Sequence, residues 1–225
     1  MSGTLLAAML APGVAQANLV TNGDFETGAL SGWSTDTDGG GPPTPLSPDF
    51  QASTSPVISG TYSGRLEADY WSTPGNTGST PQDQVTIANT LFQALTLTAL
   101  PGQQFLLKFD WVFGGQETGT PDEDVQIGLV NGGNFYDASG NLSFLVTATS
   151  YGSGSFSGLL APSYNNAGGW SLDFQLNAGN NGYGSYLLID NVSLLAVPEP
   201  ATLAIFTPAL ALLAGLRARH RSTPV

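Results

Sequence analysis

The sequence predicts an all-β fold, a jelly-roll β-sandwich, for the body of this 225-residue chain, followed by one C-terminal transmembrane helix. Apolar and β-branched runs of strand length alternate with clusters of glycine, proline and asparagine, a pattern typical of short strands joined by turns. No segment before Ala201 has a helical period. In the run 104–113, five large apolar side chains fall on one face at period two, so this face belongs inside. They are Phe105, Leu107, Phe109, Trp111 and Phe113.

At least eight strands are expected, enough for a two-sheet sandwich that protects its edges. Trp111, on the inward face of its strand, and Trp33 are expected in the core. We expect the stretch 36–56, rich in Gly, Pro, Ser and Thr, to be a long surface loop. The expected strands are 57–58, 83–88, 91–100, 104–113, 125–130, 142–149, 170–176 and 186–195, and the turns are 39–43, 74–78, 114–115, 131–134 and 180–182.

The charge of the body narrows the choice of partners. Arg65 and Lys108 are the only basic residues between Asn18 and Val197, against 16 acidic ones. Nucleic acids and anionic lipid surfaces are bound through positive charge, so the composition argues against both as partners. Divalent cations, in contrast, suit an acidic surface.

The content of Cys and His excludes most enzyme classes. The chain has no Cys, and its single His is His220, near the C-terminus. The body therefore has no catalytic triad, no Cys-His pair and no His-ligated zinc. Paired carboxylates remain as a means of glycoside hydrolysis, for example Glu117 with Asp124. The alternative for the acidic run 121–124 is a solvated turn that protects an edge strand, and no sequence feature provides the apolar pocket that a catalytic acid needs.

The N-terminal residues 1–17 fit a secretory signal peptide. An apolar run, 5–10, precedes Ala15-Gln16-Ala17, which has the small residues of a cleavage site, so the mature chain is expected to start at Asn18. No Lys or Arg precedes this run. We therefore expect the start codon to lie upstream of Met1 or the segment to be truncated.

The C-terminal residues 197–225 have three parts in a fixed order. Val197-Pro198-Glu199-Pro200 is expected to form an exposed, unstructured hinge, because proline removes a donor and restricts the preceding residue. The uncharged segment 201–216 spans about 24 Å as a helix, close to the ~30 Å hydrocarbon core of a bilayer. A C-terminal core helix is the alternative, but the polar face that it needs is missing. Three basic residues then hold the end of the chain on the cytoplasmic side: Arg217, Arg219 and Arg221.

This order of Pro-Glu-Pro motif, apolar segment and basic end closely resembles the PEP-CTERM sorting tail of Gram-negative bacteria. The resemblance covers the tail alone and implies a temporary inner-membrane anchor, cut near the motif by the protease exosortase. It further implies that the body, 18–196, reaches the cell surface or the extracellular polysaccharide matrix.

Two segments of the body resemble the first and last strands of galactose-binding-like jelly rolls, a class that includes many carbohydrate-binding modules. They are 18–28, Asn-Leu-Val-Thr-Asn-Gly-Asp-Phe-Glu-Thr-Gly, followed by Ser-Gly-Trp33, and 187–194, Leu-Leu-Ile-Asp-Asn-Val-Ser-Leu. The segment 57–67 is similar to the third strand region of that class.

The resemblance implies a structural Ca²⁺ where the terminal strands meet, with Asp24, Glu26 and Asp190 as side-chain ligands and carbonyls near Gly60 and Thr61 as helpers. Calcium takes six to eight oxygen ligands and tolerates irregular geometry. The alternative is that Asp24 makes a turn and Asp190 caps a strand end.

Aromatic side chains provide the surfaces on which sugar rings stack. Tyr70-Trp71 precedes a turn, so at least one ring is expected near the surface, either to bind a glycan or to pack under a loop. Other suitable rings in the body are Tyr136, Tyr151, Tyr164 and Trp170. We expect a non-catalytic, exported module that binds extracellular polysaccharide. The alternatives are a purely structural surface protein and a carboxylate-based hydrolase.

Overall fold

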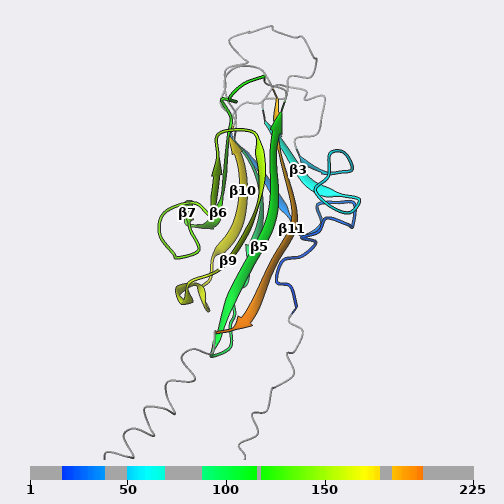
Figure 1. Cartoon of the computed structure of the whole chain (residues 1–225). Coiled ribbons are helices and arrows are strands. Elements are labelled where there is room, and N and C mark those ends of the chain that lie inside the picture. Colours follow the sequence, from blue (N-terminus) through cyan, green and yellow to red (C-terminus); the bar gives the residue numbers. More distant parts are fainter. Residues whose placement is uncertain (1–16, 39–49, 69–87, 116–117, 178–183, 200–225) are drawn as a thin grey trace, which may run out of the picture.

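The structure is a computed structural model, and it confirms an all-β sandwich of two antiparallel sheets (Figure 1). Among the described residues, no helix is long and apolar enough to cross a membrane. The expected membrane segment 201–216 and its basic end lie outside the described residues. The structure describes residues 17–38, 50–68, 88–115, 118–177 and 184–199.

The first sheet has the strand order β1-β4-β10-β6-β7, with β8 also paired to β6. Its strands are β1 (Ser34–Asp38), β4 (Ala88–Leu95), β6 (Asp124–Asn131), β7 (Asn134–Tyr136), β8 (Val146–Ala148) and β10 (Trp170–Asn177). The second sheet has the order β2-β3-β11-β5-β9. Its strands are β2 (Phe50–Ser53), β3 (Ser63–Ala68), β5 (Gln103–Gly115), β9 (Gly152–Leu159) and β11 (Ser185–Pro198), and a 3₁₀ helix, η2 (Pro162–Tyr164), follows β9.

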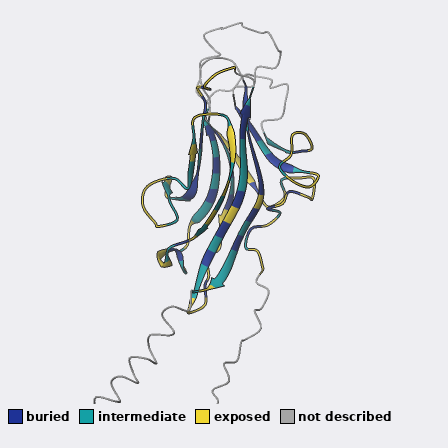
Figure 2. Cartoon of the chain, viewed as in Figure 1, coloured by how far each residue is buried: buried dark blue, intermediate teal, exposed yellow. Residues whose placement is uncertain are grey.

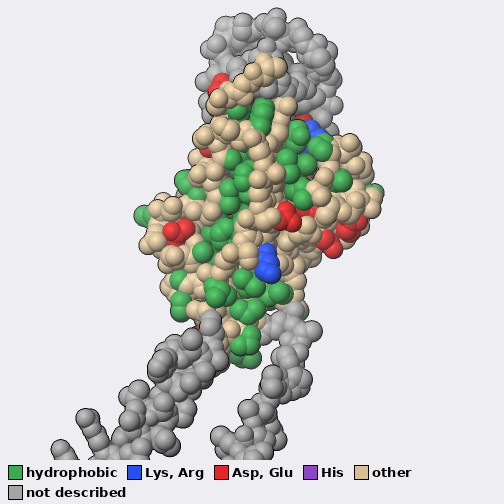
Figure 3. Space-filling view, in the orientation of Figure 1, with side chains coloured by type: hydrophobic (Ala, Val, Ile, Leu, Met, Phe, Trp, Pro, Cys, Tyr) green, Lys and Arg blue, Asp and Glu red, His purple; other side chains and the backbone are tan. Residues whose placement is uncertain are grey.

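The core lies between the sheets, where aromatic rings from both sides meet. Phe109 of β5 packs edge-on against Phe174 of β10 at 5.2 Å, and Trp33 stacks on Phe25 at 5.3 Å. Buried residues alternate along the strands with more exposed ones (Figure 2), as period-two patterning requires. Trp33 belongs to the core as expected, whereas Trp111 is only partly buried and packs against it. Figure 3 shows one face of the sandwich, on which charged side chains are few.

Several expected elements differ in the structure. Residues 57–58 do not form a strand, since Ile58 lies in a bend, and of 142–149 only Val146–Ala148 is a strand. Gly114 and Gly115, expected in a turn, continue β5 because they pair with Tyr186 and Ser185 of β11. The expected loop 36–56 contains the end of β1 and all of β2, while 39–49 lie outside the described residues.

The predicted sorting motif, Val197–Pro200, begins inside the sheet, and its first residues do not form the expected unstructured hinge. Val197 and Pro198 pair with Gln104 and Gln103 of β5. The amide of Glu199 then donates to the carbonyl of Gly102 at 2.8 Å. Pro198 is tolerated because β11 is paired only with β5 at this position, so this part of the strand is an edge, where proline can leave its missing N–H outside the ladder. The chain is therefore fixed to the sheet up to Glu199.

Candidate functional site

The N-terminal segment closes on β11, as the resemblance to galactose-binding-like domains implies. The amide of Leu19 donates to the carbonyl of Leu194 at 2.9 Å, and that of Val192 to the carbonyl of Gly23 at 2.8 Å. The Asn18 side chain makes two more hydrogen bonds to β11: its Oδ1 accepts from the amide of Leu194, and its Nδ2 donates to the carbonyl of Val192. The first residue of the expected mature chain is thus held by the last strand.

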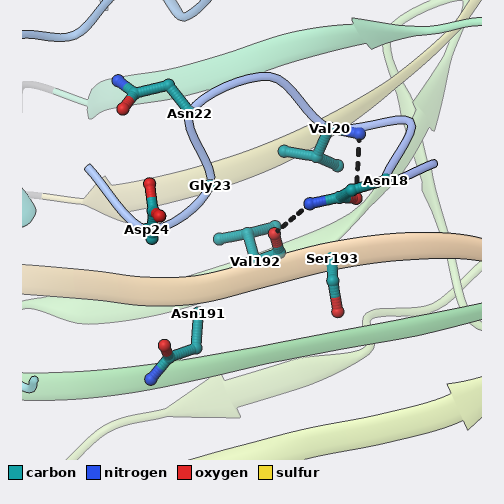
Figure 4. Close-up of a pocket in the computed structure, with 8 residues that line it drawn as sticks. All are labelled: Asn18, Val20, Asn22, Gly23, Asp24, Asn191, Val192 and Ser193. Atoms are coloured by element: carbon teal, nitrogen blue, oxygen red, sulfur yellow. Dashed lines mark hydrogen bonds between the residues drawn. The ribbon is translucent and has the colours of Figure 1, made fainter. Parts of the chain in front are cut away.

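A polar pocket of about 340 Å³ lies at this junction (Figure 4). The N-terminal segment passes over β11, and the side chain of Asn18 is turned toward Val192. Amides and a carboxylate dominate its lining, so the pocket suits small polar groups or water. The lining residues are Asn18, Val20, Asn22, Gly23, Asp24, Asn191, Val192 and Ser193.

A β-bulge in β11 shapes this pocket. The register with β5 shifts between Asp190 and Ser193. Asn191 takes the left-handed conformation at φ 53°, which asparagine tolerates better than most residues. Its Nδ2 donates to Asp110 Oδ2 at 2.8 Å and to Ser59 Oγ at 3.2 Å. The bulge therefore turns an amide side chain out of the ladder and into a network between two strands and a loop.

Asp190 is fully buried beside the bulge. Its Oδ2 accepts hydrogen bonds from the amide and hydroxyl of Ser59, both at 3.1 Å, and from the hydroxyl of Ser63 at 2.9 Å. Burial raises the pKa of Asp190, against the lowering effect of these donors and of the Asn191 amide. This carboxylate oxygen has its hydrogen bonds satisfied by the protein itself.

Glu26, in the N-terminal segment, binds the loop that also contains Ser59. Its Oε1 accepts from the amides of Thr61 at 2.8 Å and Tyr62 at 3.0 Å. These bonds, that of Tyr62 first, lower the pKa of Glu26. Gly60, at φ +62°, lies against this carboxylate, and a Cβ there would come within 2.2 Å of Oε1. The positive φ favours glycine at this position, and a side chain here would also have to displace the Glu26 carboxylate.

The predicted calcium ligands therefore meet only in part. Glu26 and Asp190 both bind the loop 59–63, whereas Asp24 lines the pocket and its Oδ1 accepts from the amide of Glu26 at 3.4 Å. Within the described ranges, no three acidic, histidine or cysteine side chains form a group that could hold a metal. Glu26 and carbonyls of the loop fit a hard cation, but Asp190 is engaged by hydroxyls and amides. Calcium at this junction stays a prediction.

A second pocket, of about 290 Å³, is aromatic and lies on the side of the first sheet. It gathers residues from the β6–β7 hairpin, the loop after β7, η2 and the start of β10. Trp170 lies at its centre, with ring centroids 4.7 Å from Tyr164 and 5.1 Å from Tyr136, both edge-on. Polar groups complete the lining, which consists of Asn131, Tyr136, Gly140, Ser163, Tyr164 and Trp170.

The two inner rings of this aromatic pocket differ in their polar ends. Tyr164 is 1% exposed, and its hydroxyl donates to the carbonyl of Asp137. Burial, and then the negative charge of Asp137, raises the pKa of Tyr164 to about 12, so it stays a neutral donor. The Nε1 of Trp170 is buried without a hydrogen-bond partner. An indole N–H without an acceptor costs free energy unless a ligand or water supplies one.

Three of the aromatic residues singled out in the sequence thus come together, namely Tyr136, Tyr164 and Trp170. Tyr151 lies elsewhere, because its hydroxyl is 2.9 Å from Ser185 Oγ and its ring meets Phe113. Tyr70 and Trp71 lie outside the described residues.

Sequence reasoning missed the polar residues of the aromatic pocket. Asn131 and Ser163 sit in turn-forming sequence, Asn-Gly-Gly-Asn and Ala-Pro-Ser, which predicts turns and gives no indication of what the turns face. The Asn131 side chain donates to the carbonyl of Gly168 at 3.2 Å, which ties the hairpin to the loop before Trp170.

The acidic run near β6 is only partly solvated. Asp122 is exposed, as expected of a solvated turn, but Glu123 is 1% exposed and points inward. Asp124 accepts from Gln126 at 3.0 Å and from Asn177 at 3.1 Å. Glu117, its suggested partner in catalysis, lies outside the described residues.

Comparison with known proteins gives similarity in structure alone. No protein-family model matches the chain, and no curated protein matches it. Among solved structures, the module TmCBM61 in complex with β-1,4-galactotriose is 15% identical, with a TM-score of 0.42, over 80% of this chain and 99% of that one. A family 16 carbohydrate-binding module is 17% identical, with a TM-score of 0.38, over 79% and 99%.

Proteins of other kinds match equally well. A cyclase from Fischerella sp. TAU is 16% identical, with a TM-score of 0.40, over 83% of this chain and 100% of that one. The α-L-arabinofuranosidase MgGH51 is 14% identical, with a TM-score of 0.43, over 80% and 26%. These identities and scores are too low to carry a function from any of these proteins to this chain.

Proposed function

We propose that this chain is an exported, non-catalytic protein whose jelly-roll sandwich binds extracellular polysaccharide in the aromatic pocket. The observation that carries the proposal is the convergence of Tyr136, Tyr164 and Trp170 on one pocket edged by an amide and a hydroxyl. Carbohydrate sites combine apolar ring faces with a few convergent polar groups, because a sugar ring has C–H faces and hydroxyl edges.

The polar groups of the pocket match this use. Ser163 offers a hydroxyl and Asn131 an amide oxygen. The partly buried Tyr136 at the edge is the ring best placed to meet a pyranose face. A pocket of about 290 Å³ takes one or two sugar units, since small-molecule sites start near 300 Å³.

The two terminal segments, 1–17 and 197–225, suggest how the protein is exported and anchored. We propose that 1–17 direct export, that 201–216 anchor the protein in the inner membrane, and that exosortase cuts near Val197–Pro200. The support is the sequence order and the resemblance to PEP-CTERM tails. The cell surface or the polysaccharide matrix is then the final location. Calcium belongs to this proposal as a structural ion beside Glu26.

The test is titration of the purified protein with matrix polysaccharide, followed by calorimetry. Replacing Tyr136 by Ala removes the outer ring and is expected to weaken binding by at least about tenfold, equal to ~1.4 kcal/mol.

The matched control is Trp111→Phe, because Trp111 is also partly buried but packs over Gly154 in the second sheet. Its binding is expected to equal that of the wild type. Polysaccharide binding that survives Tyr136→Ala unchanged would remove the pocket from the proposal, and no heat with any matrix polysaccharide would favour a purely structural role.

A further inference from the structure

A row of leucines crosses the outer face of the second sheet at the end where the sorting motif leaves. Leu159 of β9 and Leu195 of β11 both pair with Leu106 of the central strand β5. Residues opposite each other in antiparallel strands share a face, with Cβ atoms about 5 Å apart, so the three side chains are neighbours on the outer face. Leu159 is 42% exposed and Leu100, in the turn before β5, is 68% exposed. We call Leu100, Leu106, Leu159 and Leu195 the leucine patch.

The interior of the sandwich does not account for these side chains. Phe105 and Leu107, which flank Leu106, are buried and face the core, so Leu106 points the other way. Figure 3 shows hydrophobic side chains along this face, including a group at its lower end. Large apolar side chains grouped on a surface mark a contact site more often than scattered ones do.

The patch lies next to the start of the predicted membrane segment. Leu195 is three residues before Pro198, a distance of roughly 10 Å along the strand. Leu100 lies in the turn whose Gly102 carbonyl accepts from the amide of Glu199. Since the ladder and this bond fix the chain up to Glu199, only Pro200 separates the sandwich from Ala201. The body therefore has no slack that would hold it away from the bilayer.

We propose that the leucine patch rests on the lipid bilayer while the protein is anchored, with these leucines in the boundary between headgroups and acyl chains. This inference depends on the membrane anchoring proposed above and adds a second, peripheral contact to it. Apolar residues at such an interface lie about 5–10 Å into the boundary region. The contact turns the first sheet, and with it the aromatic pocket, away from the membrane.

The charges of this face fit a zwitterionic surface. Lys108 is exposed and lies two residues beyond Leu106 on the same outer face, paired with Ser157 and Ser193. A lysine above an apolar patch reaches the headgroup phosphates while its stem covers the apolar surface. The 16 acidic residues of the body disfavour an anionic membrane, so the attraction is apolar. The anchor supplies the high local concentration that so small a patch needs.

The chain has no cysteine, which allows one reporter at a chosen site. The full-length protein is reconstituted into phosphatidylcholine vesicles with an environment-sensitive fluorophore on Leu159→Cys. The matched control is Leu142→Cys. Leu142 is also a solvent-exposed leucine, 71% exposed, but it lies in the loop after β7 of the other sheet. Quenching by bromine atoms on the lipid chains is measured for both.

The label at position 159 is expected to show a blue-shifted emission and strong lipid-borne quenching, and the label at 142 neither. A Leu100→Asp change is then expected to lower the quenching at 159 while leaving that at 142 unchanged. Vesicles rich in phosphatidylglycerol are expected to give weaker quenching at 159, because of the acidic body.

Flotation with the vesicles after an alkaline wash separates the two proposals. A chain that does not float fails the anchoring proposal. A chain that floats but gives equal quenching at 159 and 142 overturns the bilayer contact. A third outcome is a blue shift at 159 that increases with the amount of protein per vesicle and comes without quenching by the lipid chains. It would mean that a second copy of the protein covers the leucine patch, and it would also overturn the bilayer contact.

Discussion

At the residue scale, Asp173 is a carboxyl whose pKa is raised by burial, and it lies in the middle of the outer face of the first sheet. It pairs with Phe92 of β4 and Gly128 of β6. Burial raises its pKa to about 6, a hydrogen bond to Ser171 opposes this, and the charge of Asp36 adds to it. Its Oδ1 is buried without a partner. Above this pKa the folded protein therefore carries a poorly solvated negative charge.

Replacing Asp173 by Asn is expected to stabilise the protein at pH 7.5. The native carboxyl binds its proton more tightly than the unfolded one, so the wild type loses stability as pH rises from about 4 to about 6 and stays less stable above. The gain from Asp173→Asn is on the order of 1–3 kcal/mol at pH 7.5 and vanishes near pH 4. Urea unfolding at both pH values measures it, and an equal effect at both would contradict the assignment.

The residues of the aromatic pocket show what a sequence reveals at this scale. That Tyr136, Tyr164 and Trp170 could serve in sugar binding was predictable, because Tyr and Trp provide surfaces on which sugar rings stack. Their grouping was not, since Tyr136 and Trp170 meet only through the β6–β10 pairing and η2. Likewise Asp190 and Glu26 were predicted to lie at one junction and do, but the hydroxyls of Ser59 and Ser63 that satisfy Asp190 had no signal in the sequence.

At the scale of elements, strands with large alternating side chains were predictable and those with small ones were not. The expected strand 104–113 is β5, and 186–195 lies within β11. β9, Gly-Ser-Gly-Ser-Phe-Ser-Gly-Leu, was missed because Gly and Ser have little strand preference. β9 pairs with β5, and Gly154 leaves room there for the Trp111 ring, whose atoms lie 3.0 Å from a Cβ placed at Gly154. The formation of β9 therefore depends on its packing against β5, which the sequence of β9 does not reveal.

The junction of the N-terminal segment with β11 depends on Gly23. A Cβ at Gly23 would lie 2.0 Å from the carbonyl oxygen of Val192, a backbone atom that cannot rotate away. Gly23→Ala is therefore expected to displace the segment and to lower the free energy of unfolding by about 1–3 kcal/mol or more.

The control for this prediction is Gly168→Ala, since no atom lies within 4 Å of a Cβ at Gly168. Its unfolding free energy is expected to stay within about 0.5 kcal/mol of the wild type. Thermal melting of the two variants side by side decides the point. Equal melting temperatures would mean that the N-terminal segment contributes nothing to the stability of the sandwich.

At the scale of the whole molecule, β11 holds the parts together. It lies between β3 and β5 in its sheet, receives the N-terminal segment at its bulge, and includes Val197 and Pro198 of the predicted sorting motif. Both described ends of the chain therefore lie against one strand, and Figure 1 shows residue 17 and the end of β11 at the same end of the sandwich. A ligand that stabilises this junction would act on the cooperative unfolding of the entire body.

Calcium is the ligand that the sequence suggests for this junction, and its effect is a matter of mass action. At a concentration one hundred times its dissociation constant, an ion bound only to the folded state adds about 2.7 kcal/mol. For a body of this size, that amounts to roughly 5–10 °C in melting temperature. Melting in excess EDTA and in added Ca²⁺ is expected to show this difference.

Two variants that replace a carboxylate by an amide test whether calcium binds at Glu26. Glu26→Gln is expected to abolish the calcium-dependent increment, because a neutral amide is a weak ligand for a hard cation. Asp122→Asn, at an exposed carboxylate far along the chain, is expected to keep it. A wild-type melting temperature that EDTA and Ca²⁺ both leave unmoved would show that the hydrogen bonds of Glu26 and Asp190 to the loop 59–63 hold the junction without metal. The stability of the junction would then depend on pH, through the lowered pKa of Glu26, and not on calcium.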